Sequence, residues 1–355
     1  MKKLKLAIIG QGRSGMQIHG AYYTSDYNKY YDVAYVVDFD EKMREKAKVL
    51  YPGCETLSDW REIFDKDVDI VVNASYSEMH FCITKELLEH GKNVLVEKPF
   101  ARNRYECDTL LKTAKDNGVY LAVFQQTFLA PFYQFATELC KSGKLGKILT
   151  VNIHYNGLAR RWDWQTLQKK LGGSVYNTGP HPIGMGLGFL DYDENATVAY
   201  SKLDLALTSG DAEDYAKILL TAPGKPLVDI EISAVDPYND FMLKIQGTKG
   251  TYKCTPTKYS MKYIVDGENV ERPYIEESIR DEKGDPAYCR EELITHEEQG
   301  EFDGDAFGFA TARFYESLYY ALTEGKEIAV TPQTAAAVIG IIEKVHADNR
   351  LERTI

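Results

Sequence analysis

Residues 4–15 read LKLAIIGQGRSG, an apolar run that leads directly into glycines at positions 10, 12 and 15. The run has the composition of a buried β-strand, and GxGxxG is the spacing that lets a chain turn tightly from a strand into a helix. The free N–H groups at the start of such a helix can bind a pyrophosphate. The stretch therefore predicts a dinucleotide site, with a simple tight turn as the alternative. The predicted cofactor contacts are Gly10, Gln11, Gly12, Arg13, Ser14 and Gly15.

The rest of the first domain alternates between strand-like and helix-like segments. Strand-like runs at 33–38, 69–75, 93–97 and 120–125 are separated by segments with helical periodicity. Strands that alternate with helices form a parallel sheet with helices on both of its faces. We therefore predict an α/β fold whose N-terminal domain, residues 1–126, is a doubly wound parallel sheet of the Rossmann type.

Asp38 favours the dinucleotide interpretation over a simple turn. It ends the second strand-like segment, about twenty residues after the glycines, where a carboxylate accepts hydrogen bonds from the ribose hydroxyls of adenosine. The same carboxylate repels a 2′-phosphate, and the next residue is Phe39 rather than an arginine. The sequence therefore predicts NAD as the cofactor, with NADP as the less favoured choice.

After residue 126 the pattern changes to strand-like segments with few helices between them. We predict an α+β domain at 127–330 with a large, mostly antiparallel open sheet. The last segment, 331–355, begins with a threonine followed by proline, the order expected at a helix start. We expect this helix to pack back on the body. The predicted strands of the second domain are 148–155, 195–203, 216–222, 227–235 and 240–247.

Charge and composition exclude several classes of protein. The net charge of −11 lies in residues 266–305, which hold 15 acidic and 4 basic residues, while the remainder has 38 of each. No basic patch is present, which argues against nucleic-acid binding, and no run of about 18 apolar residues predicts a membrane span. The six cysteines and the acidic segment lack metal-ligand spacing, so we predict no metal site. Without an export signal, we expect a cytoplasmic protein.

Two further stretches place reactive side chains at predicted element ends. EKPF, residues 97–100, follows a strand at the edge where open α/β sheets bind ligands, and Pro99 holds Lys98 in an extended backbone. GGSVYNTGPHP, residues 172–182, holds His181 between two prolines at a helix start. A helix N-terminus disfavours a charged imidazolium, so we predict a neutral histidine that can act as a general base. A solvated lysine and a structural histidine are the alternatives.

These motifs, with SEMHFCITKELLEHGKNVLVEKP and the closing VTPQTAAAVIGIIEKV helix, resemble the Gfo/Idh/MocA oxidoreductase family over nearly the whole chain. The resemblance implies a two-domain NAD(P)-dependent enzyme that oxidises or reduces sugars, cyclitols and their derivatives. It implies that Lys98 is the active-site lysine, before a proline that is often cis. It also implies that Glu97, Ser75 and His80 lie at the cofactor. For His80, a histidine bonded to the backbone is an almost equal alternative.

The chain departs from the family pattern at one position that bears on mechanism. The family usually has an aspartate four residues before the histidine, and here Asn177 stands in that place. A carboxylate would favour the charged form of Lys98, whereas an asparagine can only form hydrogen bonds. We therefore predict that His181 accepts the substrate proton, that Lys98 polarises the reacting oxygen and that Asn177 orients a neighbouring hydroxyl.

Other predicted contacts follow from the same resemblance. The ARRWDWQ segment would place Arg161 and Trp162 over the nicotinamide, with a structural loop and a salt bridge as the alternative. Gln126 and Tyr155 are predicted to bind substrate hydroxyls together with Asn177 and His181. Many family members have an arginine shortly after this glutamine. This chain has Thr127 and Phe128 there, which favours a neutral, hydroxyl-rich substrate.

The predicted function is an NAD-dependent oxidoreductase that acts on a secondary alcohol of a sugar, cyclitol or sugar derivative. One alternative is a hydrolase or lyase that retains NAD and oxidises the sugar transiently, and another is a non-catalytic NAD-binding regulatory protein. We expect a homodimer or homotetramer formed through the second domain's sheet. The reason is that VNIHY and VDIEI would place alternating apolar residues on its open face.

Overall fold

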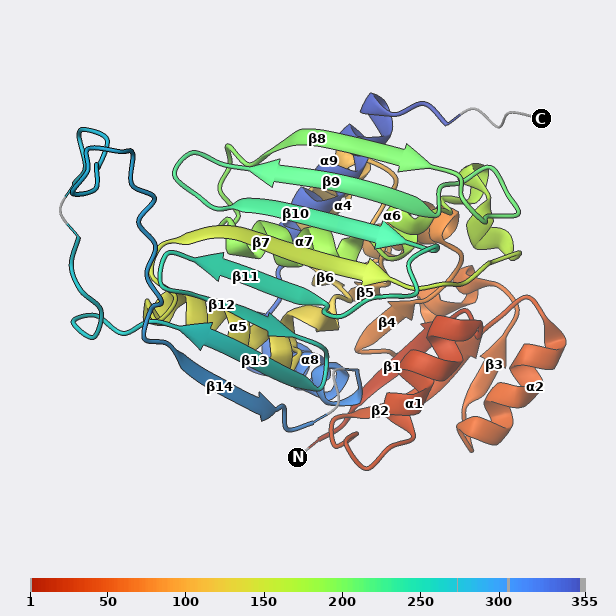
Figure 1. The fold of residues 1–355 in the computed structure, drawn as a ribbon. Coiled ribbons are helices and arrows are strands. Elements are labelled where there is room, and N and C mark those ends of the chain that lie inside the picture. Colours follow the sequence, from red (N-terminus) through yellow and green to blue (C-terminus); the bar gives the residue numbers. More distant parts are fainter. Residues whose placement is uncertain (1, 273, 305–306, 352–355) are drawn as a thin grey trace.

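The computed structural model describes residues 2–272, 274–304 and 307–351 (Figure 1). Its first sheet has six strands, all parallel, in the order β3-β2-β1-β4-β5-β6. This is the strand order of a doubly wound dinucleotide-binding sheet, so the predicted fold class of this half is confirmed. The short strand β3 was not predicted, because three residues carry too little periodicity. The strands are β1 (Leu4–Ile9), β2 (Tyr31–Val37), β3 (Glu55–Leu57), β4 (Ile70–Asn73), β5 (Val94–Val96) and β6 (Leu121–Val123).

Helices connect these strands as predicted, with one difference at the glycine-rich turn. The segment Arg13–His19 is π-helical and continues as the short α-helix α1 (Gly20–Tyr23). π-Helical turns are rare and often lie at functional sites. The other α-helices of this half are α2 (Glu41–Leu50), α3 (His80–Glu89) and α4 (Arg104–Asp116).

The second sheet has eight strands in the order β14-β13-β12-β11-β7-β10-β9-β8, and only the β7–β10 pair is parallel. The predicted large, mostly antiparallel sheet is therefore confirmed. Strands β12 to β14 were not predicted, since their many lysines and glutamates hide the alternation. The strands are β7 (Ile148–Asn156), β8 (Thr197–Asp204), β9 (Tyr215–Thr221), β10 (Leu227–Ser233), β11 (Leu243–Gly247), β12 (Gly250–Cys254), β13 (Lys258–Tyr263) and β14 (His296–Glu301).

Helices cover one face of this sheet and leave the other face open (Figure 1). They are α5 (Pro131–Ser142), α6 (Ser174–Asn177), α7 (Pro180–Phe189), α8 (Gly308–Glu324) and α9 (Pro332–Asp348). Thr331 caps the start of helix α9, since its hydroxyl accepts from the N–H of Thr334, and the helix contacts α4, α7 and β8. The domain boundaries 1–126, 127–330 and 331–355 stay predictions, and residues 352–355 lie outside the described part of the chain.

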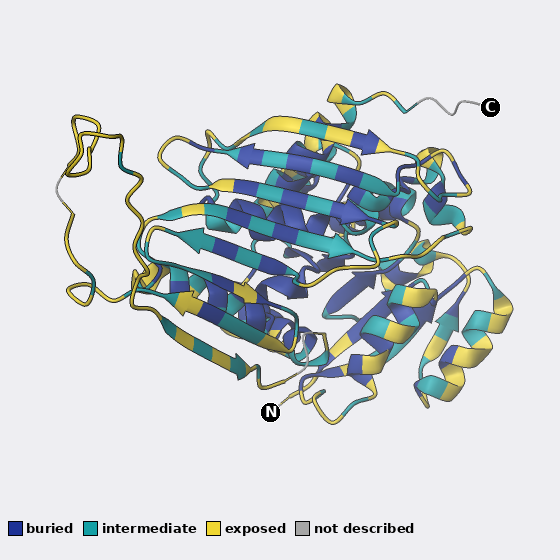
Figure 2. Cartoon of the chain, in the orientation of Figure 1, coloured by how far each residue is buried: buried dark blue, intermediate teal, exposed yellow. Residues whose placement is uncertain are grey.

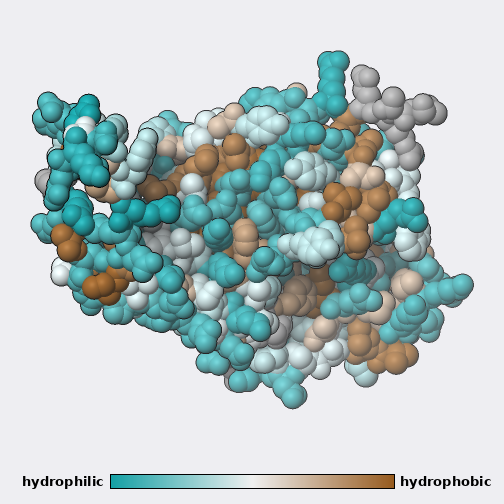
Figure 3. Space-filling model, in the orientation of Figure 1, coloured by the Kyte–Doolittle hydropathy of each residue, from teal (hydrophilic) through white to brown (hydrophobic). Residues whose placement is uncertain are grey.

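The apolar residues of β7 and β10 face the helices and not the open face. Val228 and Ile230 lie directly against Gly186 of α7, and Val151 and Ile153 are fully buried. Asn152, His154, Asp229 and Glu231 alternate with these buried residues and are only partly buried, so they face the open side. Buried and partly buried residues alternate along the strands (Figure 2), and hydrophilic residues with some hydrophobic patches cover the side seen in Figure 3. The reasoning that placed alternating apolar side chains on the open face is therefore wrong. Association of subunits through this sheet stays a prediction.

Most of the acidic segment, up to residue 295, forms a long arm between β13 and β14, and its later residues include β14 itself (Figure 1). Its described residues are exposed along most of their length, as a solvated loop would be. Among the helices of the described residues, none is long and apolar enough to cross a membrane.

Candidate active site

The three glycines of the GxGxxG turn have different surroundings. A side chain would clash with neighbouring backbone at two of them, and the third borders open space. Gly10 has φ +90°, and a Cβ there would lie 2.5 Å from the carbonyl oxygen of Ala74. A Cβ at Gly15 would lie 1.9 Å from the carbonyl oxygen of Gly10, so helix and strand can pack this closely only with glycine. A Cβ at Gly12 would meet nothing within 4 Å. Gly12 therefore borders open space, where a pyrophosphate can approach the backbone and the helix N-terminus.

Asp38 closes the turn from the next strand. Its Oδ2 accepts from the N–H of Gln11 at 2.7 Å, and its Oδ1 accepts from the N–H of Asp40 at 2.9 Å. The guanidinium of Arg44 donates to the main-chain carbonyl of Asp38 at 2.7 Å. The prediction of cofactor preference considered only Phe39, the residue after Asp38. It missed Arg44, which lies one turn inside α2 and reaches back to the Asp38 backbone.

Ser75 lies just after β4, and His80 is the first residue of α3. Ser75 Oγ donates to Asn73 Oδ1 at 2.7 Å. The ring nitrogens of His80 lie 2.7 Å from the carbonyl oxygen of Pro99 and 3.2 Å from that of Ser75. These contacts match the alternative in which His80 bonds to the backbone. They tie the end of β4 to the EKPF loop that carries Lys98.

Glu97 is buried between His19 and the backbone of Lys98. Oε1 lies 3.0 Å from Nε2 of the buried His19, and Oε2 accepts from the N–H of Lys98 at 2.9 Å. Burial alone would raise the pKa of Glu97, but the contact with His19 and the charge of Lys98 outweigh it and lower that pKa. Glu97 is therefore a buried carboxylate that fixes the backbone at Lys98, whose peptide bond to Pro99 is cis.

Lys98 reaches from this loop to the second domain. Its Nζ donates to the main-chain carbonyl of Asn177 at 2.8 Å. Burial lowers the pKa of Lys98, and the positive charges of Arg13 and Arg161 lower it further, whereas Glu97 raises it. The structure thus brings together the glycine-rich turn, Lys98 and the 159–165 loop.

His181 lies in the first turn of α7, as predicted, close to Lys98 and Tyr155. Its ring is parallel to that of Tyr155, with centroids 6.4 Å apart, and its Nδ1 lies 2.6 Å from the hydroxyl of Thr127. Burial lowers the pKa of His181 to about 3, and the charge of Lys98 contributes, while Glu97 acts in the opposite direction. The imidazole is therefore neutral at pH 7. The main cause is burial and not the helix N-terminus to which sequence reasoning attributed it.

The segment between β7 and α6 folds over the first domain. Arg161 forms an ion pair with Asp163 at 2.7 Å, as expected for the alternative in which this segment is a structural loop with a salt bridge. Trp162 is exposed. Trp164 packs edge-on against Tyr76, with centroids 5.2 Å apart, so the two domains meet here. Neither predicted residue is buried against another element. Arg161 lines the pocket described below, and Trp162 is not among the residues that line it.

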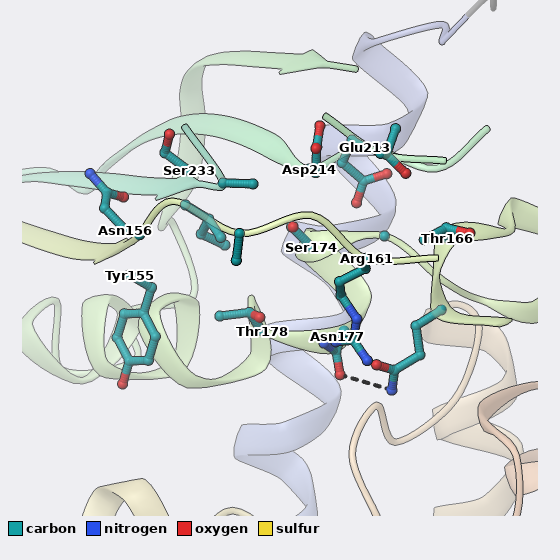
Figure 4. Close-up of a pocket in the computed structure, with 17 residues that line it drawn as sticks. Tyr155, Asn156, Arg161, Thr166, Ser174, Asn177, Thr178, Glu213, Asp214 and Ser233 are labelled. Carbon is teal, nitrogen blue, oxygen red and sulfur yellow. Dashed lines mark hydrogen bonds between the residues drawn. The ribbon is translucent and has the colours of Figure 1, made fainter. Parts of the chain in front are cut away.

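A pocket of about 240 Å³ adjoins the lysine and is shown in Figure 4. Asn177, Tyr155 and Arg161 line it, and Arg161 extends toward Asn177 in that view. The side-chain oxygen of Asn177 accepts from Nε2 of Gln165 at 3.1 Å. Gln126 lies outside this pocket, is buried, and has a side-chain oxygen without a hydrogen-bond partner among the described residues.

Glu213 is a residue of this pocket that sequence reasoning missed. It is fully buried and accepts from the N–H of Val175 at 2.9 Å, which holds the start of α6. Gly173, with φ +101°, is needed because a Cβ there would lie 2.3 Å from Glu213 Oε1. A lone glutamate in a polar segment gives no sequence signal of this role. Among the described residues, no group of three or more His, Cys, Asp or Glu side chains is arranged to hold a metal ion.

A glycine-rich turn on a parallel sheet, facing a lysine and a neutral histidine at a domain junction, defines a two-domain dinucleotide-binding oxidoreductase fold. Comparison with protein families gives the same result. Residues 4–125 match the oxidoreductase family with an NAD-binding Rossmann fold, and residues 133–253 match the GFO/IDH/MocA C-terminal domain. The chain belongs to the Gfo/Idh/MocA oxidoreductase family, so the predicted resemblance and its NAD-binding domain are confirmed.

Relatives match along the whole chain at low identity. The uncharacterized oxidoreductase YhhX of Escherichia coli is 25% identical over 352 residues, covering 96% of this chain and 95% of its own. The scyllo-inositol 2-dehydrogenase (NADP(+)) IolW of Bacillus subtilis is 22% identical over 358 residues, covering 99% and 95%. The structure of GenD2 from gentamicin A biosynthesis, solved in complex with NAD, superposes with a TM-score of 0.76 at 22% identity, covering 99% and 96%.

Proposed function

We propose that this protein is an NAD-dependent dehydrogenase that oxidises a secondary alcohol of a neutral sugar, cyclitol or sugar derivative. The observation that carries the proposal is the pair formed by neutral His181 and Lys98 at the domain junction, beside the glycine-rich turn. A neutral imidazole can accept a proton, and an adjacent ammonium can stabilise negative charge on oxygen. IolW, which acts on an inositol, supports a cyclitol-like substrate.

The residues present fit the cofactor. Open space at Gly12 allows a close approach to the backbone, and the Asp38 carboxylate stands where a ribose would bind. NAD, when bound, accepts a hydride from the alcohol carbon. We propose that His181 takes the hydroxyl proton while Lys98 donates a hydrogen bond to the same oxygen. The negative charge that develops there is then held by a fixed positive group, an effect often worth several kcal/mol.

Asn177 and the residues around it select the substrate. Its side-chain amide is neutral, and Tyr155 in the same pocket also offers a hydrogen bond, which suits a substrate hydroxyl. Gln126 lies outside the pocket and stays a predicted substrate contact. Among the predicted cofactor contacts, Arg161 and Trp162 border the nicotinamide side in this proposal. The loops on the nicotinamide side of the proposed site are shaped by Ser75, Glu97 and His80.

The proposed preference for NAD over NADP depends on Asp38. Its carboxylate accepts from the N–H groups of Gln11 and Asp40, and a negative charge held at this position opposes a 2′-phosphate. Arg44 acts against this preference, because its guanidinium lies beside the Asp38 backbone. A cytoplasmic location and a homodimer or homotetramer remain part of the proposal.

The test is a turnover screen on the purified protein. NAD or NADP is mixed with a panel of cyclitols, free sugars, sugar acids and glycosides, and the absorbance of reduced nicotinamide is followed. Accumulation with a neutral polyol and NAD supports the proposal. Cleavage or dehydration of a substrate without net accumulation favours the NAD-retaining hydrolase or lyase instead. No turnover of any kind in protein that binds NAD favours the regulatory alternative.

A further inference from the structure

Thr127 is the side chain that holds the imidazole of His181. It lies in the short helical turn Gln126–Leu129 that follows β6 and is buried against α7. Its hydroxyl oxygen is 2.6 Å from His181 Nδ1, a short hydrogen-bond distance. Within the described part of the chain, no other side chain forms a hydrogen bond with this ring.

The other polar groups near His181 are already used elsewhere. The side-chain oxygen of Asn177 accepts from Gln165, and the oxygens of Glu97 face His19 and the backbone of Lys98. Tyr155 lies parallel to the imidazole at 6.4 Å between centroids, a geometry that stacks and does not donate. The orientation of the ring is therefore set by Thr127.

We propose that Thr127 is a positioning residue, which accepts the Nδ1 proton of His181 and leaves Nε2 bare to accept the substrate's hydroxyl proton. The inference rests on the proposed function, in which His181 is the base. A neutral imidazole carries one N–H, and the partner of one ring nitrogen decides which tautomer is present. In serine hydrolases a buried carboxylate fills the corresponding role.

A hydroxyl in this position differs from a carboxylate in one respect. It fixes the tautomer but adds no negative charge that would stabilise an imidazolium. The charged groups that face His181 are then Lys98 and Glu97, both from the end of β5, with Tyr155 from β7 as the nearby titratable group. This arrangement leaves the imidazole neutral throughout the physiological pH range. Because no added negative charge stabilises an imidazolium, a proton that His181 accepts during turnover must leave it quickly.

The first test reads the tautomer directly. Full-length protein loaded with NAD is labelled with ¹⁵N-histidine, and the ring nitrogens are observed by NMR, with His181→Asn used to assign the signal. We expect a protonated Nδ1 and a bare Nε2. In Thr127→Val the tautomer should become mixed or reversed, and Thr127→Ser should restore it. A wild-type signal with a bare Nδ1 and a protonated Nε2 would overturn the proposal.

The second test measures turnover and separates the positioning role of Thr127 from the proposed alcohol oxidation. With the substrate found in the screen, Thr127→Val should lower kcat by about 10- to 100-fold, a part of what general base catalysis contributes. NAD affinity should stay the same, and Thr127→Ser should keep most of the rate. If Thr127→Val keeps the wild-type rate, the positioning role is wrong. If the wild-type tautomer is as expected but no alcohol is oxidised, the positioning role stands and the proposed reaction fails.

Discussion

Lys98 Nζ donates to the main-chain carbonyl of Asn177 at 2.8 Å, while the side chain of Asn177 is bound by Gln165. The lysine is therefore held by a main-chain carbonyl, which a residue of any type at position 177 would provide. The family's usual aspartate would add a charge at this position without being needed for the anchor. This relationship explains how the chain keeps an ordered active-site lysine with an asparagine in place of a carboxylate.

Asn177→Asp should favour the charged form of Lys98. A carboxylate at this position raises the pKa of the lysine, which burial and two arginines lower in the wild type. Since Lys98 acts as an ammonium, activity falls as pH rises through its pKa, and this fall should move to higher pH in the variant. The pH dependence of kcat/KM measures the shift. Asn177→Ser, which keeps the carbonyl and adds no charge, is the control, and identical profiles for all three proteins would contradict the account.

Asp38→Ser should weaken the preference for NAD. Loss of the carboxylate removes the repulsion of a 2′-phosphate and leaves Arg44 beside it, so NADP affinity should rise and NAD affinity should fall, each by about tenfold, or about 1.4 kcal/mol. Calorimetric titration with both cofactors measures the change. Asp40→Ser is the matched control, because Asp40 caps α2 and lies two residues away. An unchanged ratio of the two affinities would show that Asp38 does not select the cofactor.

Gly173→Ala should destabilise the fold and damage the site. The residue has φ +101°, and an added Cβ would lie 2.3 Å from the buried carboxylate of Glu213. We expect a loss of at least about 2 kcal/mol of unfolding free energy from strain and overpacking. Gly224→Ala is the control, since Gly224 has φ +72° but nothing lies within 4 Å of its Cβ, and strain alone should cost about 1 kcal/mol. Equal losses in urea unfolding would mean that the contact with Glu213 has no role.

His346→Gln should lower stability in a pH-dependent way. His346 Nε2 lies 3.5 Å from Glu213 Oε2; burial would lower the pKa of His346, but Glu213 outweighs it and raises that pKa. A raised folded-state pKa stabilises the protein below the unfolded-state pKa of about 6.5, and this stabilisation is lost as pH rises through the folded-state value. The variant should therefore lose about 1 kcal/mol at pH 6 and much less at pH 9. Thermal unfolding at both pH values checks this, and a loss independent of pH would contradict it.

The first domain could be predicted because each of its signals is local. The GxGxxG spacing, the alternation of strands and helices and the place of Asp38 are all set by short stretches of chain, and the structure has the corresponding strand order. Lys98 and His181 were singled out from the EKPF and GGSVYNTGPHP stretches together with the family resemblance, and their roles stay predictions. The second sheet was only partly predictable. Strands β12 to β14 carry mixed charges, so their pairing depends on neighbours that are distant in sequence.

The partners of the site residues could not be predicted, because they come from other elements. Thr127 was considered only because many family members have an arginine near this position. In the structure its hydroxyl lies within hydrogen-bond distance of His181 Nδ1. Glu213 supports the Gly-Gly turn from almost forty residues away, and Arg44 reaches Asp38 from the following helix. Each is an ordinary polar residue whose role depends on the folded geometry. The placement of apolar residues on the open face failed for a similar reason, since periodicity does not say which face is covered.

The most direct measurement is the turnover of His181→Ala on the substrate identified by the screen, together with its affinity for NAD. The account predicts that kcat falls by about 100- to 10,000-fold, the range for loss of a general base, while the Kd for NAD stays within about twofold. His154 lies in β7 on the open face of the second sheet, and His154→Ala should behave like the wild type. Unchanged turnover in His181→Ala would contradict the central claim that this histidine accepts the substrate proton.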